Sequence, residues 1–394
     1  MTQPGARYLD GPVAIIGAGI GGLTAALSLQ HFGVPVRVFE QARALREIGA
    51  GVTITPNAMN VLDFLGVGQA LADQAGETLR YFVRSAADGR ELERGPDPGS
   101  FVPEFGAGYC NLHRADLHLA LTDAVTKTDP DAIVLDHRFD DLEQAGDKVI
   151  ARFSNGTTFE APALIGADGG ASAVRDAVFG GQHASYTGHV ALRALVPFTR
   201  VPPAIIADPY ALYVGVGRSL IHYPLRRDTT MNLLGNAQAS QWQAEGWAIA
   251  ATVPEFLDLF DDFPAPVREL IAAIGEPDLF KWGLRDREPL PVWTRGRVTM
   301  LGDAAHPMTP YLGQGACMAI EDGMVLGRAL AASQDLAEAF SRYEAARRDR
   351  ANGVQLAARY QGRQHHGSTA SGPSSGKTAV TLGLFSYNPV TEPI

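Results

Sequence analysis

Cysteine and long apolar runs are the two features that this sequence most clearly lacks. Its 394 residues include two cysteines, Cys110 and Cys317, which are far apart and belong to no spaced pair. This excludes a disulfide framework and a cysteine metal site as the basis of the fold, and we expect no metal. The N-terminal residues lack the apolar core of a signal peptide, and the apolar run 13–16 is too short to span a bilayer. We therefore expect a cytoplasmic protein.

Positive charge is also scarce. Lys and Arg number 33 against 43 Asp and Glu, which gives a formal net charge of −10. This balance argues against nucleic acid or an anionic membrane as the main partner, because both attract basic surfaces. The chain exceeds the length of about 250 to 300 residues at which single cores stop growing, so we expect two lobes.

What the sequence does contain is glycine in ordered motifs. The apolar strand 13–16 runs into Gly17, Gly19 and Gly22 and then into the helix-forming stretch 23–30. In such a unit the first glycine permits a tight turn, the second lets the backbone approach a pyrophosphate, and the third allows close contact between helix and strand. The N-terminus of the helix then faces the phosphates, so this unit predicts dinucleotide binding.

Two acidic residues at strand ends support the same prediction. The strand 36–40 ends in Glu40, which lies about 20 residues after the glycines, where an acid accepts hydrogen bonds from a ribose diol. Far along the chain, the core strand 297–301 is followed by Gly302 and Asp303. Because open α/β sheets bind ligands at the carboxyl ends of their strands, Asp303 is expected beside the same ligand.

A change of pattern predicts two domains. From about 186 to 235 several short β runs indicate a separate sheet, which interrupts the dinucleotide domain. We expect a discontinuous domain of 1–183 and 283–360, a substrate domain of 184–282 to which 70–108 could contribute, and a tail of 361–394. The other expected elements are a glycine-rich loop at 46–57 that leads to a helix at 58–65, a helix at 113–125, a hairpin at 148–160 around Asn155 and Gly156, a helix capped by Ser172, strands at 190–196, 211–216, 219–223 and 230–234, and helices at 253–260, 264–274, 315–331 and 336–360, the last with its Arg and Glu residues on a solvated face.

Three motifs in one order resemble a known family, the single-component FAD-dependent aromatic hydroxylases that act on salicylate, hydroxybenzoates and hydroxynicotinate. They are the glycine motif at 17–22, the G-A-D-G-G-A-S-A-V-R stretch at 166–175, and the G-D-A-A-H-P stretch at 302–307 together with 313–322. The likeness covers the chain from about 12 to about 360. Because the three motifs are highly specific in this order, we expect the resemblance to include the fold.

The resemblance implies an α/β fold in which a Rossmann-like FAD-binding domain is interrupted by a mainly β substrate domain and followed by C-terminal helices. It implies FAD as cofactor, NADH or NADPH as a transient co-substrate, a small aromatic substrate and O2, in a monomer or homodimer. By this likeness, the residues that contact the cofactor are Gly17, Gly19, Gly22, Glu40, Arg46, Arg114, Asp168, Asp303, Gly313, Gln314 and Gly315.

The implied reaction has three stages. NAD(P)H reduces FAD, the reduced flavin reacts with O2, and a flavin C4a-hydroperoxide transfers one oxygen atom to a phenolic ring that deprotonation has made electron-rich. A base is therefore wanted on the substrate sheet. Strand alternation places Tyr223 on the same face as Ser219 and Ile221, and His222 on the opposite face. Similar enzymes have an active-site tyrosine at this place, so Tyr223 is preferred over His222, although Tyr223 could also be a core aromatic.

Further positions bear on the substrate. Hydroxynicotinate hydroxylases of the family have histidines where this chain has Thr53, Ser219 and Tyr311, and the stretch 310–315 is more similar to salicylate hydroxylases. Arg193, a charge inside an apolar strand, could bind a carboxylate or form an edge-strand salt bridge. We expect a monohydroxylated benzoate as substrate. The alternatives that stay open are a hydroxylase or epoxidase of a hydroxypyridine or natural-product substrate, and a non-oxygenating flavin oxidoreductase.

Overall fold

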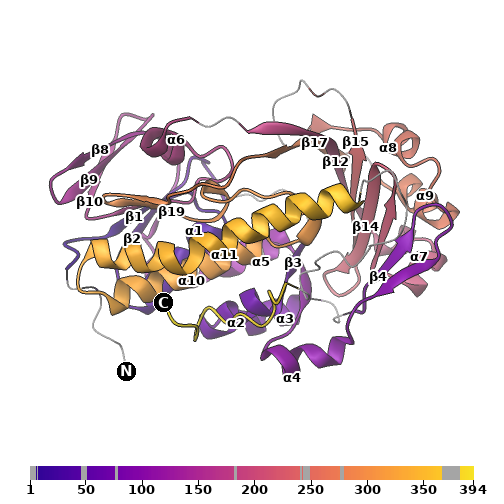
Figure 1. Ribbon diagram of the computed structural model, residues 1–394, viewed down its shortest axis with the longest axis horizontal. Helices are drawn as coiled ribbons and strands as arrows, with labels where there is room; N and C mark the ends of the chain where they lie inside the picture. Colours follow the sequence, from indigo (N-terminus) through magenta and orange to yellow (C-terminus); the bar gives the residue numbers. More distant parts are fainter. Residues whose placement is uncertain are drawn as a thin grey trace.

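The computed structural model describes residues 6, 8–45, 51–75, 79–181, 184–239, 242, 249–275, 279–365 and 382–394, and these form the predicted mixed α/β fold. A six-stranded sheet lies towards one end of the molecule and an eight-stranded sheet towards the other (Figure 1). The long helix α11 (Leu336–His365) extends between the two regions and packs on α10 (Gly315–Ala332).

The six-stranded sheet has the topology of a dinucleotide-binding domain. Its central strand β1 pairs in parallel with β2 on one side and with β11 on the other. Helix α1 (Ile20–His31) follows β1 and packs against both α5 (Arg114–Thr128) and α10, which confirms the predicted strand, turn and helix unit. In spatial order the strands are β18 (Thr294–Arg295), β19 (Val298–Met300), β11 (Leu164–Gly166), β1 (Val13–Ile16), β2 (Val36–Phe39) and β7 (Ile133–Val134).

A small antiparallel sheet lies beside this domain. It consists of β8 (Phe139–Ala145), β9 (Lys148–Phe153) and β10 (Thr158–Ala161). The predicted hairpin is confirmed, because β9 pairs with β10 and Gly156 in the turn has φ of +83°. The predicted cap is also confirmed: the hydroxyl of Ser172 accepts a hydrogen bond from a backbone N–H of α6 (Ala173–Phe179).

The eight-stranded sheet has one face covered by helices and the other turned to the middle of the molecule. Helices α8 (Val253–Leu259) and α9 (Ala265–Ala272) pack on the covered face, where Leu192 and Ala194 of β12 are buried. The intervening Arg193 belongs to the opposite face, as strand alternation requires. In spatial order the strands are β16 (Ile249–Ala250), β17 (Leu279–Asp286), β12 (Ser185–Pro197), β15 (Thr230–Gln238), β14 (Arg218–Leu225), β13 (Ala211–Gly215), β4 (Phe82–Ser85) and β5 (Glu91–Arg94).

The structure corrects several predicted boundaries. Part of the expected glycine-rich loop is a strand, β3 (Gly51–Ile54). It forms because β6 (Cys110–His113) pairs with it in antiparallel and satisfies its backbone hydrogen-bonding groups. Helix α2 spans Pro56–Phe64, and α11 continues to His365 instead of ending at 360. Strand β17 crosses the expected boundary at 283, so the division into domains remains a prediction. The other helices are α3 (Gly68–Gln74), α4 (Phe101–Phe105) and α7 (Pro203–Ala207).

The described ranges contain no helix that is both long enough and apolar enough to cross a bilayer. At the far end of the chain, residues 382–394 pack back onto the body of the protein. Leu384 and Phe385 are buried there, and Val390 contacts the main core.

Candidate active site

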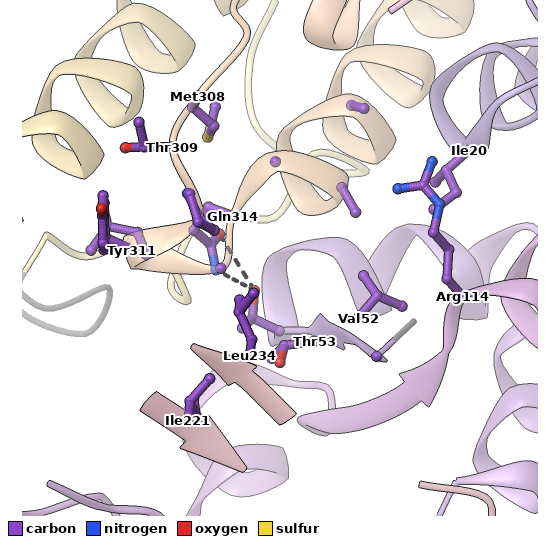
Figure 2. A pocket seen from close by; sticks show the side chains of 18 of the residues that line it. Ile20, Val52, Thr53, Arg114, Ile221, Leu234, Met308, Thr309, Tyr311 and Gln314 are labelled. Atoms are coloured by element: carbon purple, nitrogen blue, oxygen red, sulfur yellow. Dashed lines mark hydrogen bonds between the residues drawn. The ribbon is translucent and has the colours of Figure 1, made fainter. Parts of the chain in front are cut away.

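A cavity of about 450 Å³ lies between the glycine turn after β1 and the open face of the eight-stranded sheet. In Figure 2, Arg114 and Ile20 lie together at one side of this cavity and Tyr311 lies at the other, with Gln314 and Thr53 between them. The cavity is therefore long, and segments from very different parts of the sequence line it.

The three glycines of the first motif have different surroundings. Gly17 has φ of +104°, and a Cβ added there would lie 2.5 Å from the carbonyl oxygen of Ala167. A Cβ on Gly22 would lie 2.0 Å from the carbonyl oxygen of Gly17, so both glycines are required by the protein itself. Gly19 lines the cavity and has no atom within 4 Å of such a Cβ. The space at Gly19 is the kind that a closely approaching ligand fills.

Two predicted cofactor ligands hold the backbone around this turn. The carboxylate of Glu40 accepts hydrogen bonds from the backbone N–H groups of Ala18 (3.0 Å) and Ala42 (2.9 Å). The carboxylate of Asp168 accepts a hydrogen bond from the Ser172 hydroxyl at 2.5 Å and another from the backbone of α6, and burial raises its pKa. Neither side chain lines the cavity, so their direct role there is to shape the loops that do.

Asp303 and Arg114 bring opposite charges to the cavity. Asp303 lines the cavity and is accessible from it. Burial by the surrounding protein raises the pKa of its carboxyl group, and the attraction of His306 and Arg114 opposes this rise. Behind Asp303, the buried guanidinium of Arg175 donates hydrogen bonds to the carbonyl oxygens of Ala304 (3.0 Å) and Gly170 (2.9 Å). Arg175 thereby fastens the second sequence motif to the third.

The loop before α10 forms an open cradle on another wall. Gly313 has φ of +63° and open space at its Cβ position, and the nearest atoms to a Cβ on Gly315 are 3.8 Å away or more. Thr309 also lines the cavity, and its hydroxyl is buried with no hydrogen-bond partner within the described part of the chain. Open backbone, an unsatisfied hydroxyl and the N-terminus of a long helix together fit a flat cofactor that carries hydrogen-bonding groups.

A buried group of charged residues, which we call the ion cluster, lies beneath this cradle. Its acidic centre is Asp322 on α10, which accepts hydrogen bonds from the backbone N–H of Gly302 (2.9 Å) and from Arg347 Nε (2.8 Å). His306 Nε2 lies 2.6 Å from the same carboxylate. Burial alone would raise the pKa of Asp322, but the attraction of His306 and Arg347 lowers it to about 2. The ion cluster consists of His306, Glu321, Asp322, Arg347 and Arg350.

The second half of the ion cluster is connected to the cavity wall through Asn57 and Gln314. Glu321 Oε2 lies 2.5 Å from Arg347 and 2.8 Å from Arg350. Glu321 also accepts a hydrogen bond from the side chain of Asn57 (2.6 Å), which contacts Gln314 (3.3 Å) in the cradle. The prediction of a solvated Arg and Glu face on α11 is wrong for Arg347, whose side chain is 0% exposed. Only the packing of α11 on α10 reveals the acids that compensate it.

Hydroxyl groups dominate the opposite end of the cavity. The hydroxyl oxygens of Tyr109 and Tyr210 are 2.6 Å apart, and the Tyr210 and Tyr223 ring centroids are 5.5 Å apart. Burial raises the pKa of every tyrosine here, that of Tyr81 to about 12, so all are protonated at neutral pH. We call this group the hydroxyl cluster; it consists of Thr53, Tyr81, Tyr109, Tyr210 and Tyr223, all of which line the cavity.

Arg193 adds one positive charge to the hydroxyl cluster. Its charge lowers the pKa of the neighbouring Tyr223 against the effect of burial, and its guanidinium donates a hydrogen bond to the carbonyl oxygen of Gly51 (2.9 Å). Gly51 is tightly enclosed, because a Cβ there would lie 2.5 Å from the Tyr223 hydroxyl. The edge-strand salt bridge is contradicted, since β12 lies between β15 and β17 and no carboxylate within the described ranges pairs with Arg193.

The remaining predicted residues divide into two groups. Thr53 and Tyr311 line the cavity, and their contact with the substrate stays a prediction. Ser219 and His222 do not. His222 lies on the helix-covered face, with Nδ1 3.0 Å from the carbonyl oxygen of Pro209, and burial lowers its pKa to about 4. A direct catalytic role for His222 is therefore not supported.

Two further predictions concern Arg46 as a cofactor ligand and the absence of a metal. Arg46 lies outside the described residues. Among the residues that the structure does describe, no three His, Cys, Asp or Glu side chains gather as metal ligands would.

Comparison with known proteins gives this site a context. Residues 10–358 match the family model described as an FAD binding domain. The chain is 38% identical over 360 residues to a 3-hydroxybenzoate 6-hydroxylase of Polaromonas naphthalenivorans, covering 91% of this chain and 88% of the relative. It is 35% identical over 351 residues to a 6-hydroxynicotinate 3-monooxygenase of Pseudomonas fluorescens, covering 87% and 89%. Among solved structures, HpxO of Klebsiella pneumoniae complexed with FAD and uric acid is similar with a TM-score of 0.83 and 29% identity, covering 97% of this chain and 95% of the other.

Proposed function

We infer that this chain, which belongs to the FAD binding domain family, is an FAD-dependent monooxygenase that hydroxylates a phenolic aromatic acid. The finer proposal is a monohydroxybenzoate as substrate, with NADH or NADPH as reductant and O2 as oxidant. The observation that carries it is the pairing of Arg193 with Tyr223 on one wall of the cavity, opposite the cradle at Gly313 and Gly315. This wall offers a cation for a carboxylate and a hydroxyl for a phenolic oxygen.

The first part of the proposal concerns the cofactor. FAD, when bound, supplies the redox chemistry that activates dioxygen. The turn at Gly19 and the N-terminus of α1 would hold its pyrophosphate. Glu40, which accepts a hydrogen bond from the backbone N–H of Ala18, would keep this turn in shape beside the ribose. Arg114 would neutralise phosphate charge, and Asp303 would accept hydrogen bonds from hydroxyl groups of the cofactor. The open backbone at Gly19, Gly313 and Gly315, with space at each Cβ position, supports this placement of the cofactor.

The second part concerns what the protein does to the substrate. Because burial raises the pKa of Tyr223, its hydroxyl is a hydrogen-bond donor at neutral pH and is not an ionised base. This changes the role expected from the sequence: Tyr223 Oη would donate a hydrogen bond to the phenolic oxygen and stabilise it as a phenolate. Arg193 would hold the carboxylate and add electrostatic stabilisation, which favours attack on an electron-rich ring.

A benzoate ring is favoured over a pyridine ring on two grounds. This chain lacks the histidines expected of a hydroxynicotinate hydroxylase, because the corresponding positions are Thr53, Ser219 and Tyr311. In addition, two apolar side chains of the sheet, Ile221 and Leu234, line the cavity and offer a pyridine nitrogen no hydrogen bond. Since the named relative with 38% identity is a 3-hydroxybenzoate 6-hydroxylase, 3-hydroxybenzoate is the first substrate to test.

The decisive experiment is a substrate panel with product identification. The purified holoenzyme is mixed with NADH or NADPH and with each of the three hydroxybenzoates, 6-hydroxynicotinate, benzoate and phenol. We expect accelerated nucleotide oxidation matched by hydroxylated product for one or more hydroxybenzoates, and no product from benzoate. If only 6-hydroxynicotinate yields a hydroxylated product, the monohydroxybenzoate is wrong as the substrate and a hydroxypyridine takes its place. Hydrogen peroxide release without hydroxylated product from every compound would contradict the function.

Tyr223→Phe tests the donor. A hydrogen bond to a charged group is worth about 1.5 to 3 kcal/mol, so kcat should fall roughly 10- to 100-fold while FAD stays bound. Tyr213→Phe is the matched control, because Tyr213 is a buried tyrosine of the neighbouring strand on the helix-covered side. Normal turnover by the Tyr223 variant would remove the residue from the proposal.

Gly19→Ala tests the cofactor position without disturbing the protein. An added methyl group meets no protein atom within 4 Å at Gly19 or at Gly108, and Gly108 does not line the cavity. Only the Gly19 variant should lose FAD, measured as the flavin-to-protein absorbance ratio and the FAD dissociation constant. Equal FAD content in the two variants would contradict the placement.

A further inference from the structure

The C-terminal segment, defined here as residues 382–394, contributes to the cavity although it lies beyond the part of the chain that matches the family model. That match ends at residue 358. Phe385 nevertheless lines the cavity and is only 5% exposed. In Figure 1 this segment is the yellow trace below α11 that ends near α10. One wall of the cavity is therefore built from a region that the family comparison does not cover.

Phe385 packs against aromatic side chains at the hydroxyl end of the cavity. Its ring centroid lies 6.0 Å from that of Phe101, 5.7 Å from that of Phe105 and 6.2 Å from that of Tyr109. Tyr109 shares the short hydroxyl contact with Tyr210. Phe385 is thus both a surface of the cavity and a support for Tyr109 of the hydroxyl cluster.

The segment is anchored to the ion cluster. Arg350 donates a hydrogen bond to the carbonyl oxygen of Leu384 (3.2 Å), and its guanidinium lies 3.9 Å from the centroid of the Tyr387 ring. Arg347 approaches the same ring at 5.5 Å. Further along, Arg328 of α10 donates to the carbonyl oxygen of Pro389 (2.6 Å). Such contacts on both sides of Phe385 fix its position against the cavity.

We propose that Phe385 is a specificity-determining residue that limits the size of the aromatic ring the cavity accepts. The proposal deepens the proposed function and rests on it for the class of ligand. A buried phenyl ring is bulky and apolar. Phe101 and Phe105 pack against the ring of Phe385 and leave it little freedom to move aside. A two-ring arene would overlap the space that Phe385 fills, whereas a single ring would use it as a wall.

The test compares Phe385→Ala with Leu384→Ala. Leu384 is the neighbouring buried residue of the segment but does not line the cavity, so its variant controls for loosening of the segment. The ligands are 3-hydroxybenzoate and 3-hydroxy-2-naphthoate, titrated into each holoprotein while the flavin absorbance is recorded. We expect Phe385→Ala to shift the ratio of the two dissociation constants about tenfold or more towards the naphthoate, as pocket space commonly does. FAD content should match that of the control.

Different outcomes separate this inference from the proposed function. If the wild-type protein neither binds nor hydroxylates any hydroxybenzoate, the proposed function fails. If it binds hydroxybenzoate and the ratio moves no further in Phe385→Ala than in Leu384→Ala, only the role of Phe385 is overturned. Should the alanine variant not fold, Phe385→Leu must shift the ratio in the same direction, and an unchanged ratio there overturns the inference.

Discussion

The ion cluster and the hydroxyl cluster keep polar atoms inside the protein by opposite means. In the ion cluster every charge has a partner of opposite sign, as with Arg347 between Glu321 and Asp322. In the hydroxyl cluster burial keeps the tyrosines uncharged, and Arg193 has neutral partners within the described chain. All hydroxyl-cluster residues line the cavity, and no ion-cluster residue does.

The difference shows that polar groups which stabilise the fold lie away from the cavity, whereas polar groups available to a ligand line it. A buried charge that is paired with an opposite charge is already compensated, so it interacts only weakly with a ligand. A protonated hydroxyl or a cation without a counter-ion can still stabilise negative charge on a bound molecule. The ion cluster should therefore govern stability, and the hydroxyl cluster should govern substrate affinity and turnover.

The largest expected effect comes from Asp322→Asn. The variant removes the charge that compensates Arg347 and that binds the N–H of Gly302, so the free energy of unfolding should fall by about 3 to 5 kcal/mol. Urea unfolding of the holoprotein measures it. Glu143→Gln, which breaks an exposed pair with Arg152, is the control and should cost about 1 kcal/mol or less. Equal losses in the two variants would end the distinction between the clusters.

The next effect sharpens the functional side. Arg193→Met should raise the dissociation constant of the preferred hydroxybenzoate about 10- to 100-fold, because a hydrogen bond to a charged group is worth about 1.5 to 3 kcal/mol. Phenol, which lacks the carboxylate, should bind both proteins with similar affinity. Titration followed by flavin absorbance measures both constants. An equal loss for phenol and hydroxybenzoate would mean that Arg193 shapes the cavity without binding the carboxylate.

Acid should act on the ion cluster. The pKa of Asp322 is lowered to about 2 from an ordinary value of 3.8, so its ionised form stabilises the fold above about pH 4. This contribution, about 2 kcal/mol, is lost as the pH falls from about 4 to about 2. The difference in unfolding free energy between wild type and Asp322→Asn should shrink over that range. A constant difference would show that the Asp322 charge is not the source of the stability.

The smallest expected effect is that of Tyr109→Phe. Removing one hydroxyl of the pair with Tyr210 costs a neutral hydrogen bond, about 1 kcal/mol in unfolding free energy. Because no charge is left unpaired, the loss should be well below that of Asp322→Asn under the same conditions. Thermal unfolding of the two holoproteins compares them. A loss as large as that of Asp322→Asn would show that the hydroxyl cluster is also a major source of stability.

The sequence alone determined the features that depend on neighbouring residues. The turn at Gly17, the helix after it and the hairpin at Gly156 follow from glycine conformations and hydrophobic periodicity, which are local properties. Strand alternation also placed Tyr223 and His222 on opposite faces correctly. The order of three specific motifs was sufficient for the family and for FAD.

Only the tertiary structure decided which distant side chains meet. The contacts between Arg347 and Asp322 and between Phe385 and Tyr109 join segments that are far apart in the chain, and no local pattern encodes them. The structure likewise turned Arg193 from a possible edge residue into a cation of the cavity, because strand order depends on long-range pairing. Burial, which raises the pKa of Tyr223, depends on everything packed around it, so its role as a donor could not be derived from its place in the sequence.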